Sequence, residues 1–356
     1  MTNIFQTPAP GFQAVRHSGD ILMVSLQLDS AREGKAFLRT NLGQAHVRRA
    51  EIIANVEHGR AILGRDWHDL PMRQADERSF QITLPLCQVG LFEFKTFFVP
   101  DDGGELVWPK GENVRVKIEP SATVSGNTIY NAFVRQFGPN RSGQAWTKAH
   151  RDAETFLSQA GYTVLPPSGT FADLRRELPV IMDQLGFRII QLLPIHPAPV
   201  TFGRMGRFGS PFAPLDFFTV DASLAVFDRH TTPLEQFSQL VADIHSRDGL
   251  VLIDLPADHT GWGSVMQVHH PEWFTRNEDG SFASPGAWGV IWEDLCKLNF
   301  EDKTLWMQLA EVFLHWCQLG VDGFRCDAGY MIPAPVWTYI TARVRDKVPA
   351  FASEQA

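Results

Sequence analysis

From residue 129 onward, strand-like apolar runs alternate with amphipathic helical patterns, and this alternation limits the possible folds more than any other feature. Leu174, Leu178 and Ile181, for example, recur at helical spacing. Alternation of this kind is typical of β/α units packed around a parallel sheet. The expected strands are at 129–137, 188–194, 250–255, 321–326 and 350–354, and the expected helices are at 171–185, 233–247, 304–319 and 335–348.

The first third of the chain predicts a different class, an N-terminal all-β sandwich. Short apolar or alternating runs occupy 21–28, 46–56, 79–84, 91–99 and 113–118, and turn residues separate several of them. The expected domains are therefore a β-sandwich at 1–119, a linker at 120–128 and an α/β domain at 129–356.

Composition narrows the classes of function. The chain has 356 residues, enough for about two domains, and 44% hydrophobic with 20% charged residues is typical of a globular protein. A formal net charge of −8 argues against a nucleic-acid groove, and the chain has neither a polybasic run nor an apolar run long enough to span a membrane. The sequence has four cysteines, and they lack metal-ligand spacing: Cys87, Cys296, Cys317 and Cys326. Since no secretory signal is visible either, we expect a cytoplasmic protein.

Ionisable residues follow three consecutive expected strands. Because the carboxyl ends of parallel strands share one rim of a barrel, these residues should lie together. Side chains alternate along a strand, so Arg325 and Asp327 should point to the same side. An arginine beside a carboxylate favours its ionised form, as a nucleophile requires, while Glu354 could stay protonated in a drier setting. Two carboxyl groups in opposite protonation states suit glycoside hydrolysis.

Five segments in order resemble the α-amylase family, glycoside hydrolase family 13, over roughly residues 129–356. They are Gly-Ser-Pro-Phe-Ala-Pro-Leu-Asp-Phe at 209–217, Leu-Val-Leu-Ile-Asp-Leu-Pro-Ala-Asp-His-Thr at 250–260, His-Pro-Glu-Trp-Phe at 270–274, Gly-Val-Asp-Gly-Phe-Arg-Cys-Asp-Ala at 320–328 and Phe-Ala-Ser-Glu-Gln-Ala at 351–356. The resemblance implies a TIM (β/α)8-type barrel, of which about the first five β/α units are present, with a small excursion at about 260–300. The N-terminal sandwich resembles the starch- and glycogen-binding domains attached to many members.

The resemblance also implies roles for individual residues. Asp327 would be the nucleophile, and Glu354 would be the acid that protonates the leaving oxygen and then the base that activates water. Arg325 would support Asp327 electrostatically and completes the expected catalytic set. His259 would hydrogen-bond the sugar in the cleavage subsite, and Asp254 would brace the substrate-binding rim.

Aromatic residues complete the expected substrate-binding set. Phe212 stands where the family usually has a stacking tyrosine. Trp262, Trp288 and Trp292 are the tryptophans that we expect to contact sugar, although core packing or loop anchoring is an alternative for each of them. Calcium is common in the family, but Asp258 stands where Asn is commoner and no oxygen-rich ligand loop is readable, so no metal or cofactor is expected.

The expected function is a retaining α-glucan-active glycoside hydrolase, of the amylase or debranching type, that acts on a glucan or maltooligosaccharide by double displacement. One alternative is a transglycosylase or maltosyltransferase, in which an acceptor sugar or phosphate replaces water. The family's fourth segment, a His-Asp pair, has no counterpart, so the chain is expected to be truncated after the fifth barrel strand, and a catalytically inactive carbohydrate-binding fragment is a further alternative. The enzyme hypothesis requires that Asp327 and Glu354 lie about 5–5.5 Å apart.

Overall fold

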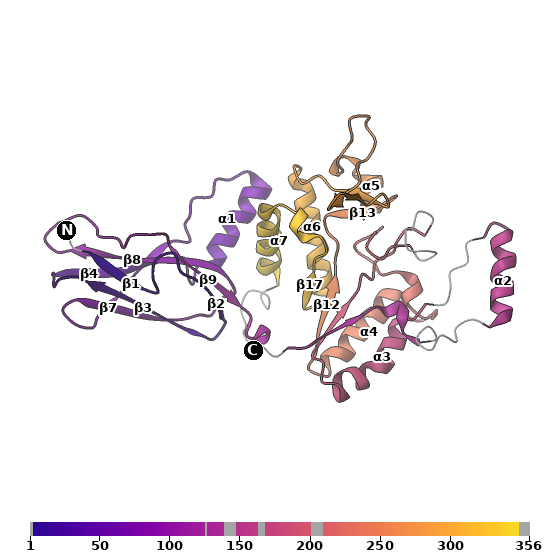
Figure 1. Ribbon diagram of the computed structural model, residues 1–356, viewed down its shortest axis with the longest axis horizontal. Helices are drawn as coiled ribbons and strands as arrows, with labels where there is room; N and C mark the ends of the chain where they lie inside the picture. The colour runs from indigo at the N-terminus through magenta and orange to yellow at the C-terminus, as the bar shows by residue number, and fades with distance from the viewer. Residues whose placement is uncertain (1–2, 125–126, 139–146, 163–167, 201–208, 349–356) are drawn as a thin grey trace. The chain divides into compact units, whose positions relative to one another are not determined.

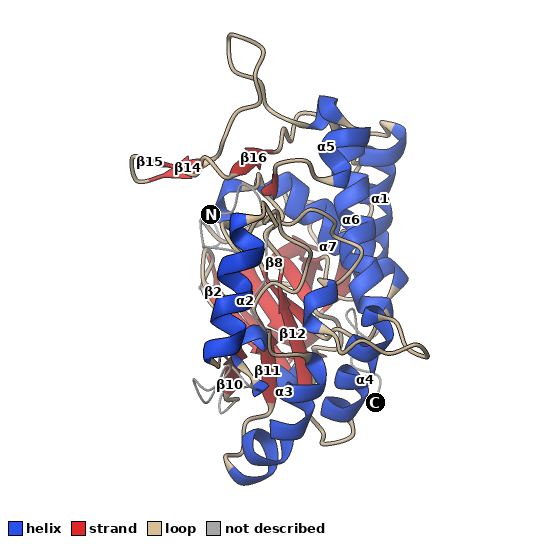
Figure 2. Ribbon diagram, turned by 90° about the vertical axis from the view of Figure 1, so that its right-hand side faces the viewer, coloured by secondary structure: helices blue, strands red, loops and turns tan. Residues whose placement is uncertain are grey.

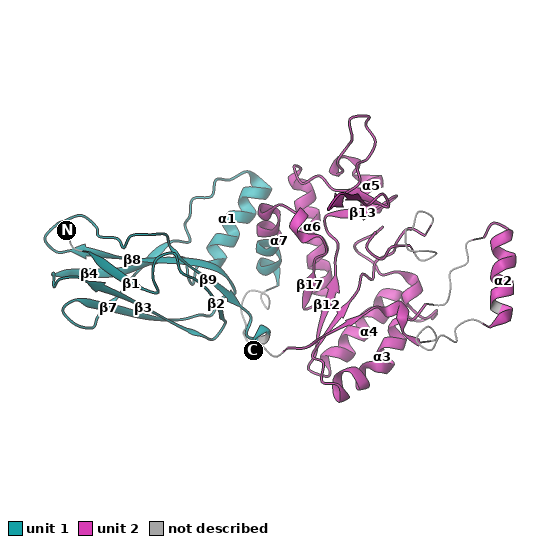
Figure 3. Cartoon of the chain, in the orientation of Figure 1, with its two compact units in different colours: residues 1–126, 341–356 teal, residues 127–340 magenta. Residues whose placement is uncertain are grey.

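The computed structural model describes residues 3–124, 127–138, 147–162, 168–200 and 209–348 (Figure 1). The chain divides into two compact units, residues 1–126 with 341–356 and residues 127–340 (Figure 3). Within the described ranges, no helix has both the length and the apolar character needed to cross a lipid bilayer.

The first unit contains a β-sandwich. One sheet has four strands in the order β1-β3-β7-β6, and the other has five strands in the order β2-β9-β8-β4-β5. The parallel pair β2–β9 lies at one edge, and the other pairings are antiparallel. The strands are β1 (Ile4–Thr7), β2 (Gln13–His17), β3 (Ile21–Leu28), β4 (Gly34–Thr40), β5 (His68–Pro71), β6 (Arg73–Gln74), β7 (Ser79–Pro85), β8 (Gly90–Pro100) and β9 (Val114–Glu119).

Alternating burial along the strands builds the core between the two sheets. In β3, Leu22, Val24 and Leu26 are buried while their neighbours are more exposed, as a period of two requires. They pack in one apolar cluster with residues of the other sheet such as Phe94 and Val116. Four of the expected strands are thus confirmed, whereas β1, β2, β4, β5 and β6 were not predicted.

The expected strand at 46–56 is wrong, because this segment forms helix α1 (Ala45–His58). Its β-branched valines and isoleucines suggested a strand, but the alanines, arginines and glutamates between them favour a helix. Gly59 ends the helix with a left-handed φ of 65°. This glycine was the sequence signal for a helix end.

The second unit is built on a four-stranded parallel sheet in the order β10-β11-β12-β17. The strands are β10 (Ile129–Ala132), β11 (Ile189–Leu192), β12 (Leu250–Asp254) and β17 (Gly323–Arg325). Figure 2 shows β10, β11 and β12 side by side. The α/β class is confirmed, and the five-unit barrel stays a prediction, since the expected strand at 350–354 lies outside the described residues. The first strand is shorter than expected because a 3₁₀ turn, η2 (Val134–Gln136), follows it.

Helices follow the strands in sequence, close to where the apolar spacing predicted them. They are α2 (Lys148–Gln159), α3 (Phe171–Leu178), α4 (Pro233–His245), α6 (Lys303–Gln318) and α7 (Ala334–Lys347), of which α2 was not predicted. Thr232 and Glu235 form a capping box at the start of α4. The expected helix at 171–185 is α-helical only to Leu178, because Pro179 lacks an N–H donor and begins a π-helical turn, η4 (Pro179–Gln184).

Between β12 and α6 the chain makes an excursion of small elements. Strands β13 (His259–Gly261) and β16 (Leu295–Lys297) pair antiparallel, and helix α5 (Val265–His269) lies between them in sequence. A hairpin of β14 (Gly286–Ala287) and β15 (Val290–Ile291) carries Trp288 at its turn.

Candidate active site

The last residues of β12 and β17 bring two of the expected site residues together. Asp254 and Arg325 are direct partners in the parallel register of these neighbouring strands. Asp254 is buried, with 1% of its surface exposed, whereas the side chain of Arg325 is 45% exposed. The pair therefore joins the interior of the unit to its surface.

Arg325 also holds the expected nucleophile. Its Nη1 donates to both carboxylate oxygens of Asp254, at 3.0 and 2.9 Å, and lies 2.8 Å from Oδ1 of Asp327. The prediction that Arg325 and Asp327 point to the same side is confirmed by this contact. The side chain of Asp327 remains 32% exposed, so a buried carboxylate anchors an arginine that in turn orients an accessible one.

Burial controls the electrostatics of Asp254. It raises the pKa of Asp254 to about 6, since a carboxylate is poorly solvated there, and the nearby charge of Asp327 adds to the rise. The hydrogen bonds and charge of Arg325 oppose it. Asp254 therefore depends on Arg325 to stay ionised, and its bracing role at the rim stays a prediction.

The backbone beside Asp327 is unusual. Ala328 has a φ of 49°, in the left-handed region that non-glycine residues rarely adopt. This conformation begins the 3₁₀ turn η8 (Gly329–Met331) directly after Asp327. Backbone strain of this kind costs on the order of 1–3 kcal/mol and clusters at functional sites.

His259 lies in the first strand of the excursion and is 1% exposed. Its Nε2 is 2.7 Å from the carbonyl oxygen of Phe212, and its Nδ1 is 2.9 Å from Oδ1 of Asp258. Burial lowers the pKa of His259, but the adjacent carboxylate of Asp258, the carbonyl of Phe212 and the charge of Asp327 together outweigh burial and raise the pKa above its usual value. Both ring nitrogens face protein acceptors, and the sugar contact of His259 stays a prediction.

The expected aromatic residues occupy different surroundings. Phe212 is half-buried beside His259, and the ring of Trp292 meets the ring of His259 edge to face at 6.4 Å. Trp262 is anchored within the excursion, where its Nε1 donates to the carbonyl of Glu293 at 2.8 Å. Trp262 is thus tied to its own loop, Phe212 and Trp292 share His259 as a neighbour, and sugar contact by these residues stays a prediction.

Trp288 is 88% exposed and its ring lies 6.3 Å from that of Tyr330, which is 67% exposed. Tyr330 follows Asp327 by three residues, so this contact brings the hairpin to the segment of the expected nucleophile. Tyr330 was not predicted from the sequence. Its position so soon after Asp327 was the only available signal.

Glu354 lies outside the described residues, so its separation from Asp327 stays a prediction. Among the described side chains, no group of three or more His, Cys, Asp or Glu residues could hold a metal ion. Among the described residues, the candidate site thus consists of Arg325 ion-paired with both Asp254 and Asp327, and of a histidine and aromatic residues on the adjoining excursion.

No family model matches the chain. Its curated relatives include proteins named alpha-1,4-glucan:maltose-1-phosphate maltosyltransferase. One from Rhodospirillum rubrum is 30% identical over 198 residues, 51% of this chain and 27% of that protein. One from Cereibacter sphaeroides is 29% identical over 222 residues, 56% of this chain and 36% of that protein. The matched part of this chain thus spans about a third or less of these relatives' length.

The solved structures that this chain is similar to include an alpha-amylase from Lactobacillus plantarum. It is 27% identical, with a TM-score of 0.48, over 63% of this chain and 43% of that chain. The type III pullulan hydrolase from Thermococcus kodakarensis is 16% identical, with a TM-score of 0.49, over 98% of this chain and 60% of that one. The ordered motifs and the curated relatives agree in showing that this chain is similar to the α-amylase family, glycoside hydrolase family 13.

Proposed function

We propose that this chain carries the nucleophile of a retaining enzyme that cleaves α-linked glucans by double displacement. One observation carries the proposal: Nη1 of Arg325 holds the accessible carboxylate of Asp327 at 2.8 Å while it is itself anchored on buried Asp254. A carboxylate kept in one position beside a positive charge is suited to attack an anomeric carbon. The exposed fraction of Asp327 leaves it open to a substrate.

The chemistry proceeds in two steps. A carboxylate oxygen of Asp327 bonds to the anomeric carbon as the glycosidic C–O bond breaks, and Glu354 gives its proton to the leaving oxygen. An acceptor O–H then attacks the same carbon, its proton returns to Glu354, and the bond to Asp327 breaks. Two inversions give net retention at the anomeric carbon.

Hydrolysis and transfer differ only in the acceptor. With water the products are shorter glucans, and with phosphate or a sugar they are a glycosyl phosphate or a longer glucan. Transfer is the second candidate function, favoured by the printed name of the curated relatives, maltosyltransferase. Analysis of the products from maltoheptaose, with and without inorganic phosphate, separates the two.

The test of the nucleophile is Asp327→Asn in the full chain. We expect turnover of maltoheptaose to fall by at least on the order of a thousandfold, since an amide cannot form the covalent intermediate. Asp228→Asn, a change to an exposed loop carboxylate, is the matched control. Turnover in Asp327→Asn equal to that of the control would refute the proposal.

The acid role of Glu354 has its own test. Glu354→Gln should slow maltoheptaose cleavage strongly but slow a glycosyl fluoride much less, because fluoride leaves without a proton. The same loss on both substrates would show that Glu354 is not the acid.

A further inference from the structure

The loop at 209–217 is tied to the excursion that follows β12. The backbone N–H of Gly261 donates to the carbonyl of Pro214 at 2.9 Å. The backbone N–H of Val265 donates in the same way to the carbonyl of Leu215 at 2.8 Å. These two bonds hold the second half of the loop, and a side-chain contact holds its first half.

That side chain belongs to His259, the first residue of β13. Its Nε2 lies 2.7 Å from the carbonyl oxygen of Phe212, and its Nδ1 lies 2.9 Å from Oδ1 of Asp258. A carbonyl oxygen and an ionised carboxylate only accept hydrogen bonds. Both contacts are therefore favourable together only when each ring nitrogen carries a proton, which makes His259 an imidazolium.

The surroundings of Asp258 explain why the ring is charged. The side chain of Asp258 is 2% exposed, and neither carboxylate oxygen accepts a hydrogen bond from a described residue outside the ion pair with His259. An ionised carboxylate removed from water is stable only beside a cation. The imidazolium of His259 is the cation that this geometry supplies.

The other charges around His259 agree with this assignment. Burial lowers its pKa, yet the pKa is raised overall, since Asp258 and the carbonyl of Phe212 outweigh burial. The charge of Asp327 adds to the rise. Lys297, the register partner of His259 on β16, is exposed, so water screens its ammonium group. Two carboxylates thus favour the charged ring.

The charge strengthens the contact with Phe212. A hydrogen bond from a charged donor is shorter and roughly twice as strong as a neutral one, and the 2.7 Å separation of Nε2 from the carbonyl oxygen belongs to this class. The bond holds the backbone of Phe212. The half-buried ring of Phe212 therefore cannot turn away with the loop unless the bond breaks.

We propose that His259 is a positioning residue: kept charged by Asp258, it fixes the loop at 209–217 and with it the aromatic ring of Phe212. The imidazolium then acts on a substrate through Phe212, because neither of its nitrogens has an N–H left for a sugar hydroxyl. An asparagine at 258 would leave His259 neutral and its contact with the loop weaker. The effect on a substrate rests on the proposed function, whereas the charge and the loop contact do not.

The charge is tested by NMR on the full chain with ¹⁵N in its histidine rings. At pH 8 an ordinary histidine is neutral and has one ring N–H, whereas His259 should show two. His259→Gln removes both signals and so assigns them. Asp258→Asn should leave one, because an amide does not stabilise a cation as a carboxylate does. A single ring N–H signal from His259 at pH 8 in the wild type would overturn the proposal.

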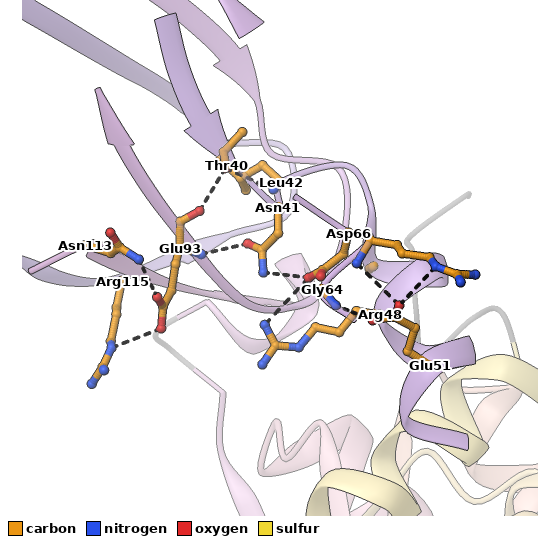
Figure 4. Close-up of polar contacts among 12 residues, drawn as sticks. Thr40, Asn41, Leu42, Arg48, Glu51, Gly64, Asp66, Glu93, Asn113 and Arg115 are labelled. Atoms are coloured by element: carbon orange, nitrogen blue, oxygen red, sulfur yellow. Dashed lines mark hydrogen bonds and ion pairs between the residues drawn. The ribbon is translucent and has the colours of Figure 1, made fainter. Parts of the chain in front are cut away.

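Asp66→Asn is the matched control, since it removes a buried carboxylate from the first unit. Asp66 is 4% exposed, accepts a hydrogen bond from Nδ2 of Asn41 at 3.0 Å and lies 4.0 Å from Nη1 of Arg48 (Figure 4). This variant should keep both ring N–H signals of His259. Loss of one signal in Asp66→Asn would show that the ion pair with Asp258 is not what maintains the charge.

The positioning role is tested by a double-mutant cycle of His259→Leu and Phe212→Ala. All four proteins carry Asp258→Asn, so that no buried carboxylate loses its partner. Each change should raise KM for maltoheptaose by roughly fivefold with little change in kcat, and the two together should raise it by no more, because one residue acts through the other. Independent effects, a combined rise of about 25-fold, would mean that His259 contacts the sugar directly and would overturn the positioning role.

Hydrogen exchange at the loop is a readout that needs no turnover. In the Asp258→Asn protein, His259→Leu should speed exchange of the backbone amides at 209–217, and unchanged exchange would overturn the proposal. If exchange and the ring N–H signals behave as expected but the wild-type chain shows no turnover, the positioning role stands and the proposed function fails. If the wild-type chain turns over maltoheptaose but His259 shows one ring N–H signal, the proposed function stands and the positioning role fails.

Discussion

Arg325→Met should destabilise the protein more at pH 8 than at pH 5. The variant keeps an unbranched side chain but leaves Asp254, which is 1% exposed, without the guanidinium that it accepts two hydrogen bonds from. A buried carboxylate without its partner is costly, whereas a protonated one is not. The size of the effect therefore depends on whether Asp254 is charged.

The magnitude follows from the pKa of Asp254. Burial already raises it from 3.8 to about 6 with Arg325 in place, a cost of about 3 kcal/mol at neutral pH. Because the pKa of Asp254 is higher in the folded state, its contribution to the stability of the fold is fully present below pH 3.8 and is lost as the pH rises through about 6. Removing Arg325 raises this pKa further. Because Arg325 is 45% exposed and water screens it, we expect an extra loss of only about 2 kcal/mol at pH 8 relative to pH 5.

The assay measures the free energy of unfolding of variant and wild type by urea denaturation at both pH values. Because the two proteins are compared at the same pH, the contributions of the other titrating groups cancel. In the Asp254→Asn background, Arg325→Met should show the same loss at pH 5 and pH 8. An equal loss at both pH values in the Asp254 background would refute the reasoning, because Asp254 would then not be the group that Arg325 compensates.

Three other changes test separate parts of the structure. Ala328→Gly should increase the free energy of unfolding by about 1 kcal/mol and so raise the thermal midpoint, since glycine accepts a φ of 49° without strain. Turnover should fall because Asp327 is positioned less firmly, and a lower midpoint would contradict the strain argument. Burial lowers the pKa of His196 to about 4, so the free energy of unfolding of the wild type should fall by about 3 kcal/mol as the pH drops from 6.5 toward 4. His196→Phe should reduce this pH dependence in urea titrations, and an unchanged pH dependence would exclude His196 as its cause. Asp66→Ala should cost about 1–3 kcal/mol in urea titrations, because it leaves buried Nδ2 of Asn41 without the carboxylate that it donates to. Asp76→Ala, a change to an exposed carboxylate, is its control and should cost less; equal losses would argue against the hydrogen bond between Asn41 and Asp66 as the cause.

Residue spacing was sufficient to predict the second unit's parallel strands and the joint orientation of Arg325 and Asp327. A period of two along β17 determines which side chains share a face, and the parallel register with β12 then places Asp254 opposite Arg325. Local patterns were weaker guides elsewhere. In α1, the β-branched residues favour a strand and the alanines, arginines and glutamates favour a helix, so the local pattern predicts the wrong element.

The contacts that no spacing could predict are those made between distant loops. Trp288 meets Tyr330 through a hairpin turn and a 3₁₀ turn, and neither has a periodic pattern that fixes its direction. The left-handed φ of Ala328 is equally invisible in the sequence, since alanine gives no sign of it.

The strained backbone of Ala328 and the buried carboxylate of Asp254 both lie next to the contacts of Asp327. Arg325, whose own anchor is buried, contacts the side chain of Asp327, and the next residue along the chain, Ala328, has a strained left-handed backbone. A carboxylate that an anchored arginine already positions loses little conformational entropy when it reacts, and the cost of positioning it is met during folding. The strain at Ala328 and the buried charge of Asp254 therefore both serve to fix the position of one carboxylate. Restoring either to a relaxed state should make the protein more stable and Asp327 a poorer nucleophile.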